Sequence, residues 1–159
     1  MRIAVGADNF GAELKDAVKA HLTAAGHDVQ DLGGEAPYYA TAAEAARRIG
    51  HGQAERAILC CGTGMGMAII ANKFPGVYAA VCENAEAAEK SRSINNSNVL
   101  TLGGFLTTPE AAREIVHRWM STEFTAGWNP EIKAWLENSM KDIALLEERQ
   151  FGAGLQAKK

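Results

Sequence analysis

The chain has 159 residues, which is enough for one compact domain and too few for two of ordinary size. Hydrophobic residues make up 47% and charged residues 22%, values that exclude a disordered chain. The net charge of −3 and the lack of a cluster of lysines and arginines argue against a nucleic-acid-binding protein.

In chain order, short apolar runs alternate with longer amphipathic segments. We predict a strand at residues 3–7, a helix at 11–25, a strand at 29–32, a helix at 38–49, a strand at 57–61, a helix at 65–73, a strand at 77–82, a helix at 85–93, a strand at 98–102 and helices at 109–121 and 132–149. Thr108 as N-cap and Pro109 at the first helical position mark one helix start. We expect one domain over residues 1–150 and a flexible tail over 151–159.

No segment of the sequence indicates export or membrane insertion. Residues 1–5 lead straight into a strand pattern, without the layout of a signal peptide, and no apolar run approaches the roughly 20 residues that cross a bilayer. The three cysteines, Cys60, Cys61 and Cys82, are a poor disulfide framework and favour reduced thiols. We therefore expect a cytoplasmic protein without membrane or nucleic-acid partners, and no metal site, because Cys-x-x-Cys and His-x-x-x-His spacings do not occur.

Five strands that alternate with helices predict an α/β fold, a parallel sheet covered on both faces. The third and fourth strands are apolar throughout, so we expect both to be buried. In a five-stranded sheet of order 2-1-3-4-5, ligands bind beyond the carboxyl ends of strands one and three. These strands end at Asp8 and Cys61, so both residues are expected at one crevice.

A glycine-rich loop, Gly62 to Gly66, follows Cys61 and opens a helix. Glycines let the backbone approach a ligand closely, and the amides at a helix start favour negative charge, as on a phosphate or an enediolate. The same helix start stabilises the thiolate form of Cys61. The loop matches neither a Walker loop nor a full dinucleotide fingerprint.

Position alone leaves each candidate residue open. Cys61 is either a reactive thiolate or a small buried hydrophobe, which is the role we expect for Cys60 and Cys82. Asp8 either contacts a ligand or caps the following helix. The Asn95-Asn96 pair either binds a ligand or forms a turn.

Four blocks of sequence carry a more specific signal: Gly6-Ala7-Asp8, Cys61-Gly62-Thr63-Gly64-Met65-Gly66-Met67, Ala71-Asn72-Lys73-Phe74-Pro75-Gly76-Val77 and Ser91-Arg92-Ser93-Ile94-Asn95-Asn96-Ser97-Asn98-Val99-Leu100. With these blocks, residues 2–125 resemble the ribose-5-phosphate isomerase type B and galactose-6-phosphate isomerase family. The resemblance implies a flavodoxin-like sheet, a homodimer or homotetramer with the active site between subunits, and aldose–ketose isomerisation through a cis-enediol without a metal or other cofactor.

The resemblance also implies roles for individual residues. Cys61 matches the family's catalytic base, Thr63 contacts the reacting end of the substrate, Asp8 contacts the substrate, and Asn95 binds sugar oxygens. The loop from Gly62 to Gly66 matches the anion hole. The full set of expected substrate contacts is Asn9, Gly62, Gly64, Met65, Gly66, Asn95, Arg92 and Lys133.

The chain also departs from the family pattern. Asn9 replaces a histidine, and Ile94 stands where family members have the histidine that opens the sugar ring. Phe105 and Trp128 lie where phosphate-binding arginines are common, and neither can replace a bidentate guanidinium. Lys133 is the nearby cation.

These departures lead to three hypotheses. The lost ring-opening histidine favours an open-chain substrate, such as the tetrose phosphates used by related branches of the family. The lost arginines favour instead an unphosphorylated keto sugar or sugar acid, whose carboxylate Arg92 and Lys133 would bind. From another class, the chain could be a non-catalytic sugar-phosphate-binding subunit of a heteromeric isomerase.

Overall fold

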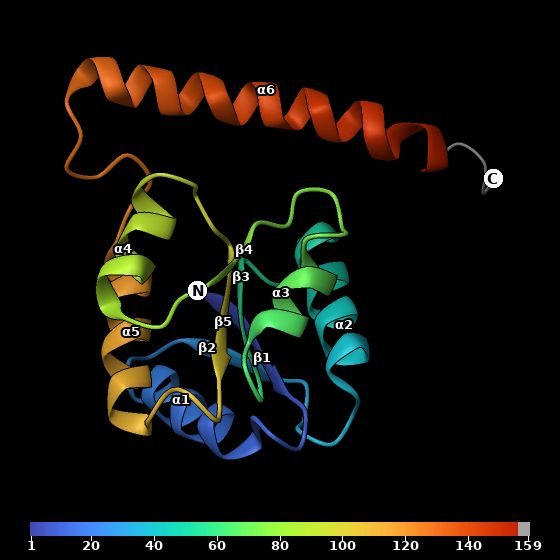
Figure 1. Cartoon of the computed structure of the whole chain (residues 1–159), viewed down its shortest axis with the longest axis vertical. Coiled ribbons are helices and arrows are strands. Elements are labelled where there is room, and N and C mark those ends of the chain that lie inside the picture. Colours follow the sequence, from blue (N-terminus) through green and yellow to red (C-terminus); the bar gives the residue numbers. More distant parts are fainter. Residues whose placement is uncertain (156–159) are drawn as a thin grey trace.

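A computed structural model of the chain describes residues 1–155 and shows a five-stranded parallel sheet between two layers of helices (Figure 1). The strands are β1 (Arg2–Ala7), β2 (Asp28–Asp31), β3 (Arg56–Cys61), β4 (Ala79–Val81) and β5 (Val99–Gly103). The helices are α1 (Ala12–Ala24), α2 (Tyr38–Gly50), α3 (Met65–Ala71), α4 (Ala85–Ser93), α5 (Pro109–Ser121) and α6 (Pro130–Leu155). The predicted α/β fold is confirmed.

The order of the strands, β2-β1-β3-β5-β4, corrects the predicted 2-1-3-4-5. β5 is buried along its whole length and pairs with β3, whereas β4 has three partly exposed residues and lies at the edge. The expectation that the fourth strand is buried on both sides was therefore wrong. The longer apolar strand occupies the interior because only there can both of its faces be covered.

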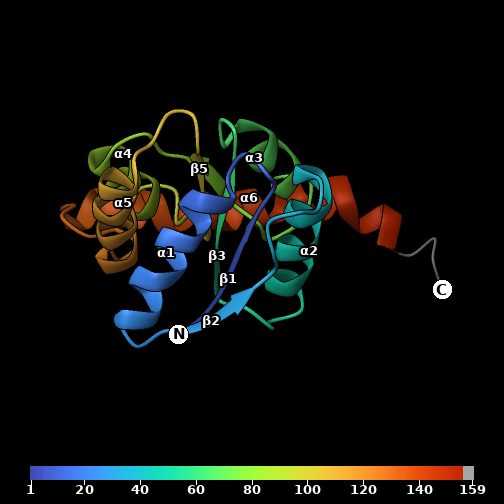
Figure 2. The same ribbon diagram turned by 90° about the horizontal axis from the view of Figure 1, so that it is seen from below.

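Helices cover both faces of the sheet. Helices α1, α4 and α5 lie on one face, and α2 and α3 lie on the other (Figure 2). Each face has its own hydrophobic core: Trp119 is fully buried in the first, and Met67 in the second. The start of α5 is as predicted, because the Thr108 Oγ1 accepts a hydrogen bond from the amide of Ala111.

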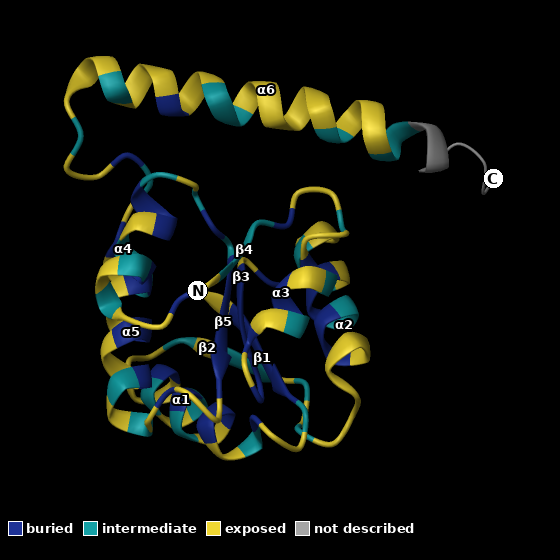
Figure 3. Cartoon of the chain, in the orientation of Figure 1, coloured by how far each residue is buried: buried dark blue, intermediate teal, exposed yellow. Residues whose placement is uncertain are grey.

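Helix α6 crosses the amino-terminal edge of the sheet (Figure 1). It continues beyond the predicted end at residue 149 and takes in residues 151–155 of the predicted tail, whereas residues 156–159 lie outside the described part. Leu136, within α6, is buried. Much of the surface of α6 is nevertheless exposed (Figure 3), and Trp135 and Leu146 are among its exposed side chains. Within residues 1–155, none of the helices is both long and apolar enough to cross a membrane.

Candidate active site

The loop after β3 holds the thiol of Cys61 against the start of α3. The backbone amide of Gly64 donates a hydrogen bond of 3.1 Å to the Cys61 Sγ. Gly64 has a φ of +77°, a left-handed conformation that favours glycine. The first intrahelical bond runs from the Ala68 amide to the Gly64 carbonyl, so the amides before Ala68 have no partner within the helix.

Close packing between the backbones of this loop and of β5 requires glycine at one position in each, Gly64 and Gly103. A Cβ added to Gly103 would lie 2.8 Å from the Thr63 carbonyl carbon, and one added to Gly64 would lie 3.0 Å from the backbone of Leu102. The loop after β5 packs alongside the loop after β3, because the Gly104 amide donates a hydrogen bond of 2.7 Å to the Cys61 carbonyl. The ends of β3 and β5, with the loops that follow them, thus form one platform around Cys61.

Asp8 follows β1 and lies beside the end of β3, as we expected from the predicted ends of strands one and three. Its amide donates to the Cys60 carbonyl at 3.2 Å, and its Oδ1 accepts from the amides of Phe10 (2.9 Å) and Gly11 (3.2 Å). Asp8 thus closes the turn that precedes α1. The alternative that Asp8 caps this helix is wrong, because Gly11 occupies the N-cap position and no side chain caps the helix there. Both side-chain bonds use Oδ1, which leaves Oδ2 outside the turn. The neighbouring Asn9 is exposed.

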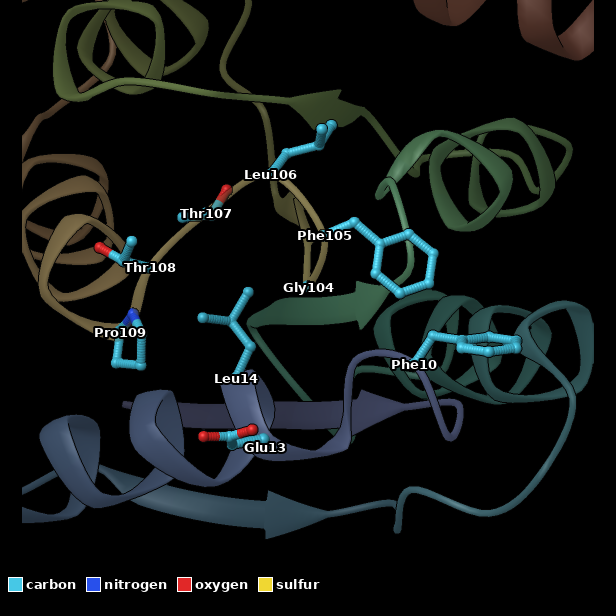
Figure 4. A pocket seen from close by; sticks show the side chains of 9 residues that line it. All are labelled: Phe10, Glu13, Leu14, Gly104, Phe105, Leu106, Thr107, Thr108 and Pro109. Atoms are coloured by element: carbon cyan, nitrogen blue, oxygen red, sulfur yellow. The ribbon is translucent and has the colours of Figure 1, made fainter.

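Two aromatic rings flank the platform, and sequence analysis overlooked one of them. Phe10 and Phe105 meet edge to face with ring centroids 5.5 Å apart, and a Cβ on Gly62 would lie 2.7 Å from the Phe105 ring. Beside them, a cavity of about 290 Å³ opens between α1 and the loop after β5 (Figure 4). The signal for Phe10 was an aromatic residue two positions after the strand-end Asp8.

The cysteines separate as strand alternation predicts. Cys60 is completely buried in the core beneath α1, whereas Cys61 faces the opposite core. Burial raises the pKa of the Cys60 thiol above its ordinary value, which disfavours its thiolate. Burial also raises the pKa of Cys82. Both residues fit the structural role expected of them.

Asn95 lies at the opposite edge of the sheet from Cys61. It follows α4 and precedes β5, whose first residue pairs with Ala57 near the start of β3. The length of β3 separates the two edges by about 13 Å. Asn95 and Ile94 line a second cavity, of about 550 Å³, between this edge and α6. Within one chain, Asn95 and Cys61 therefore do not lie in the same cavity.

Arg92 and Lys133 do not line either cavity. Arg92 is 5% exposed, and its guanidinium donates to the carbonyls of Ser97 (2.6 Å) and Thr122 (3.3 Å). The structure therefore corrects the expectation that Arg92 contacts the substrate, because these protein acceptors already engage the guanidinium. Lys133 is exposed in the first turn of α6.

Comparison with known proteins decides the family. The family model described as Ribose/Galactose Isomerase matches residues 3–134. The chain belongs to the ribose/galactose isomerase family. The prediction that it is an isomerase is confirmed at this level.

Relatives of this isomerase family cover different shares of the chain. The 4-deoxy-4-sulfo-D-erythrose isomerase of Clostridium sp. (strain MSTE9) is 40% identical over 97% of this chain and 100% of that protein. The D-erythrulose-4-phosphate isomerase of Pectobacterium atrosepticum is 39% identical over 80% of this chain and 87% of that protein. The Arabidopsis thaliana DNA damage-repair/toleration protein DRT102 is 41% identical over 96% of this chain, which spans about half (52%) of that protein.

The fold of this isomerase agrees with a solved structure of the family. Ribose-5-phosphate isomerase B of Clostridium thermocellum superposes with a TM-score of 0.85 at 33% identity, covering 94% of this chain and 99% of that one. The likeness thus extends over almost the whole chain, including most of α6.

Proposed function

We propose that the chain interconverts an aldose and a ketose of four carbons in open-chain form, with Cys61 as the base and with an anionic group at the far end of the substrate. The observation that carries this proposal is the placement of the Cys61 Sγ, 3.1 Å from the Gly64 amide at the start of α3. The Gly64 N–H therefore points directly at the sulfur that would take the substrate proton.

In the proposed mechanism, the Cys61 thiolate takes the proton from the carbon next to the carbonyl. The electron pair of the broken C–H bond forms the double bond of the enediolate, whose negative oxygen is held by amides at the start of α3. The Thr63 hydroxyl, exposed on the same loop, passes a proton between the two sugar oxygens. Return of the proton from Cys61 to the neighbouring carbon completes the isomerisation.

A complete site requires two copies of the chain. The half that holds Cys61 and Asp8 lies at the carboxyl edge of the sheet, and the half that holds Asn95 lies at the amino edge. In a two-fold dimer, each chain can add its Asn95 half to the Cys61 half of the other. Exposed apolar side chains support such contacts: Phe105 is 68% exposed beside Cys61, and Trp135 is 62% exposed on α6.

The lining of the second cavity supports an open-chain substrate. Ile94 stands beside Asn95 in that cavity, and an isoleucine side chain can neither donate nor accept the proton that ring opening requires. A four-carbon sugar with a phosphate or sulfonate on its last carbon needs no such step. Two relatives, at 39% and 40% identity, are named for four-carbon sugars of this kind. Lys133 is the cation that we assign to the anionic group.

The test is a comparison of substrates with the purified chain. We expect kcat/KM for erythrulose 4-phosphate or 4-deoxy-4-sulfoerythrose to exceed that for ribose 5-phosphate at least about 100-fold. The Cys61→Ala variant serves as the inactive control. Equal or faster turnover of ribose 5-phosphate would refute the open-chain assignment. Turnover of unphosphorylated sugar acids alone would refute the anionic end group, and binding without turnover would indicate a non-catalytic subunit.

A further inference from the structure

The turn that carries Asn95 is anchored from inside the protein by a buried arginine. The Arg92 Nη1 donates to the Asn96 Oδ1 at 2.9 Å and to the Ser97 carbonyl at 2.6 Å. Asn96 has a φ of +50°, a left-handed conformation that is uncommon for residues other than glycine. The hydrogen bond from Arg92 therefore holds a strained residue directly after Asn95.

Buried contacts extend this anchor into the core. The Trp119 Nε1 donates to the Ser97 Oγ at 2.8 Å, and the Ser91 Oγ lies 2.9 Å from the same Ser97 oxygen. The Trp119 ring also lies against Arg92, whose Cζ is 6.0 Å from the ring centroid. Every contact engages the inner side of the turn and leaves the Asn95 side chain exposed at the second cavity.

Arg56 provides a matched comparison within the same core. It also lies against Trp119, with its Cζ 5.1 Å from the ring centroid, and it donates to the carbonyls of Trp119 and Met120 at the end of α5. None of the hydrogen bonds of Arg56 within residues 1–155 reaches the turn at Asn95. Burial, together with the charge of Arg56, lowers the pKa of Arg92 to about 10, so Arg92 stays cationic at neutral pH.

We propose that Arg92 is a positioning residue for the isomerase reaction: its guanidinium fixes Asn96 and Ser97 so that Asn95 meets the substrate in one orientation. The proposal rests on the function proposed above. Arg92 acts through Asn95 and does not touch the substrate. Displacement of a substrate-orienting group by about 1 Å can reduce turnover 100-fold, which sets the size of the expected effect.

The experiment compares Arg92→Lys and Asn96→Gly with the control Arg56→Lys. Glycine adopts a positive φ without strain, so Asn96→Gly removes the side-chain acceptor and spares the backbone; it keeps the test valid if Arg92→Lys fails to fold. We expect both turn variants to lower kcat/KM for the best tetrose substrate about 10- to 100-fold. Arg56→Lys should lower the melting temperature but leave kcat/KM within about twofold, because it spares the turn.

Amide hydrogen exchange provides a readout that does not depend on activity. The amides of Asn96 and Ser97 bond to the carbonyls of Arg92 and Ser91, and we expect their exchange to accelerate at least about tenfold in Arg92→Lys but not in Arg56→Lys. Unchanged exchange, or equal kinetic losses in both arginine variants, would overturn the positioning role. An inactive wild-type chain with accelerated exchange in Arg92→Lys would refute the proposed function and leave the anchoring of the turn by Arg92 established.

Discussion

The Gly64 amide points at the Cys61 Sγ from 3.1 Å, and this hydrogen bond connects the end of β3 to the start of α3. Among the hydrogen bonds of residues 1–155 it has no counterpart at Cys60, which precedes Cys61 by one residue and is completely buried in the opposite core. Two adjacent thiols therefore have opposite environments, one with a hydrogen-bond donor for a thiolate and one that disfavours charge.

Replacement of Cys61 by alanine is expected to lower kcat/KM at least about 100-fold, because the reaction loses its base. The melting temperature should also fall slightly, because Cys61 is 5% exposed and the missing sulfur leaves a small cavity in the second core. Steady-state kinetics and thermal unfolding measure the two effects. Turnover in Cys61→Ala at the wild-type rate would contradict the assignment.

Replacement of Cys60 by alanine is the matched control. We expect unchanged kinetics and a loss of about 1 kcal/mol in the free energy of unfolding, because the missing sulfur leaves a small cavity in a fully buried position. A kinetic defect as large as that of Cys61→Ala would mean that neither variant reports on chemistry.

Mixed dimers test whether the site is shared between subunits. The variants Cys61→Ala and Asn95→Ala should each be inactive as homodimers, yet a mixed dimer keeps one site with both residues intact. Random assortment after joint refolding should therefore restore about a quarter of the wild-type activity. No recovery, although mass spectrometry detects the mixed dimer, would show that Cys61 and Asn95 act within a single chain.

Two glycines near the site should differ sharply in their tolerance of alanine. A Cβ on Gly11 would lie 2.3 Å from the Cys60 backbone, which cannot move without disturbing β3. A Cβ on Gly62 would instead meet the exposed Phe105 ring, which can rotate away. We expect Gly11→Ala to lose at least about 2 kcal/mol of unfolding free energy and Gly62→Ala about 1 kcal/mol or less. Urea denaturation measures both values, and equal losses would count against this account.

Asp31 should stabilise the fold in a pH-dependent manner. Burial alone raises its pKa, but hydrogen bonds from Lys19, the Gly33 amide and Lys15 outweigh it and lower the pKa to about 2. Because the folded pKa lies below the unfolded one, the stabilisation is complete above about pH 4 and disappears as the pH falls towards 2. It amounts to at most about 2 kcal/mol.

The variant Asp31→Asn tests this dependence. At pH 7 its free energy of unfolding should lie below that of the wild type by up to about 2 kcal/mol, and the difference should shrink by pH 3. Urea denaturation at the two pH values measures it. A difference that stays constant between them would show that the loss comes from packing and not from the charge.

Local sequence signals were sufficient for most elements and for part of the site. The boundaries of α4 and α5 agree with the predicted ranges, because caps and helical periodicity act over a few residues. The meeting of Asp8 with the end of β3 was also predictable, since the ends of neighbouring parallel strands share one edge of the sheet. The family motifs added the chemistry, whose assignment to Cys61 remains a prediction.

Contacts between distant segments decided the remaining features. The observed order of strands has β5, not β4, beside β3. The sequence could not predict this pairing, because periodicity within a strand carries no information about its neighbour in the sheet. The burial of Arg92 depends on Trp119, 27 residues later in the chain, and on the Thr122 carbonyl, which becomes an acceptor only after α5 packs on α4. Likewise, motif order could not show that Asn95 and Cys61 lie at opposite edges of the sheet, because that separation arises from the direction in which β3 and β5 run.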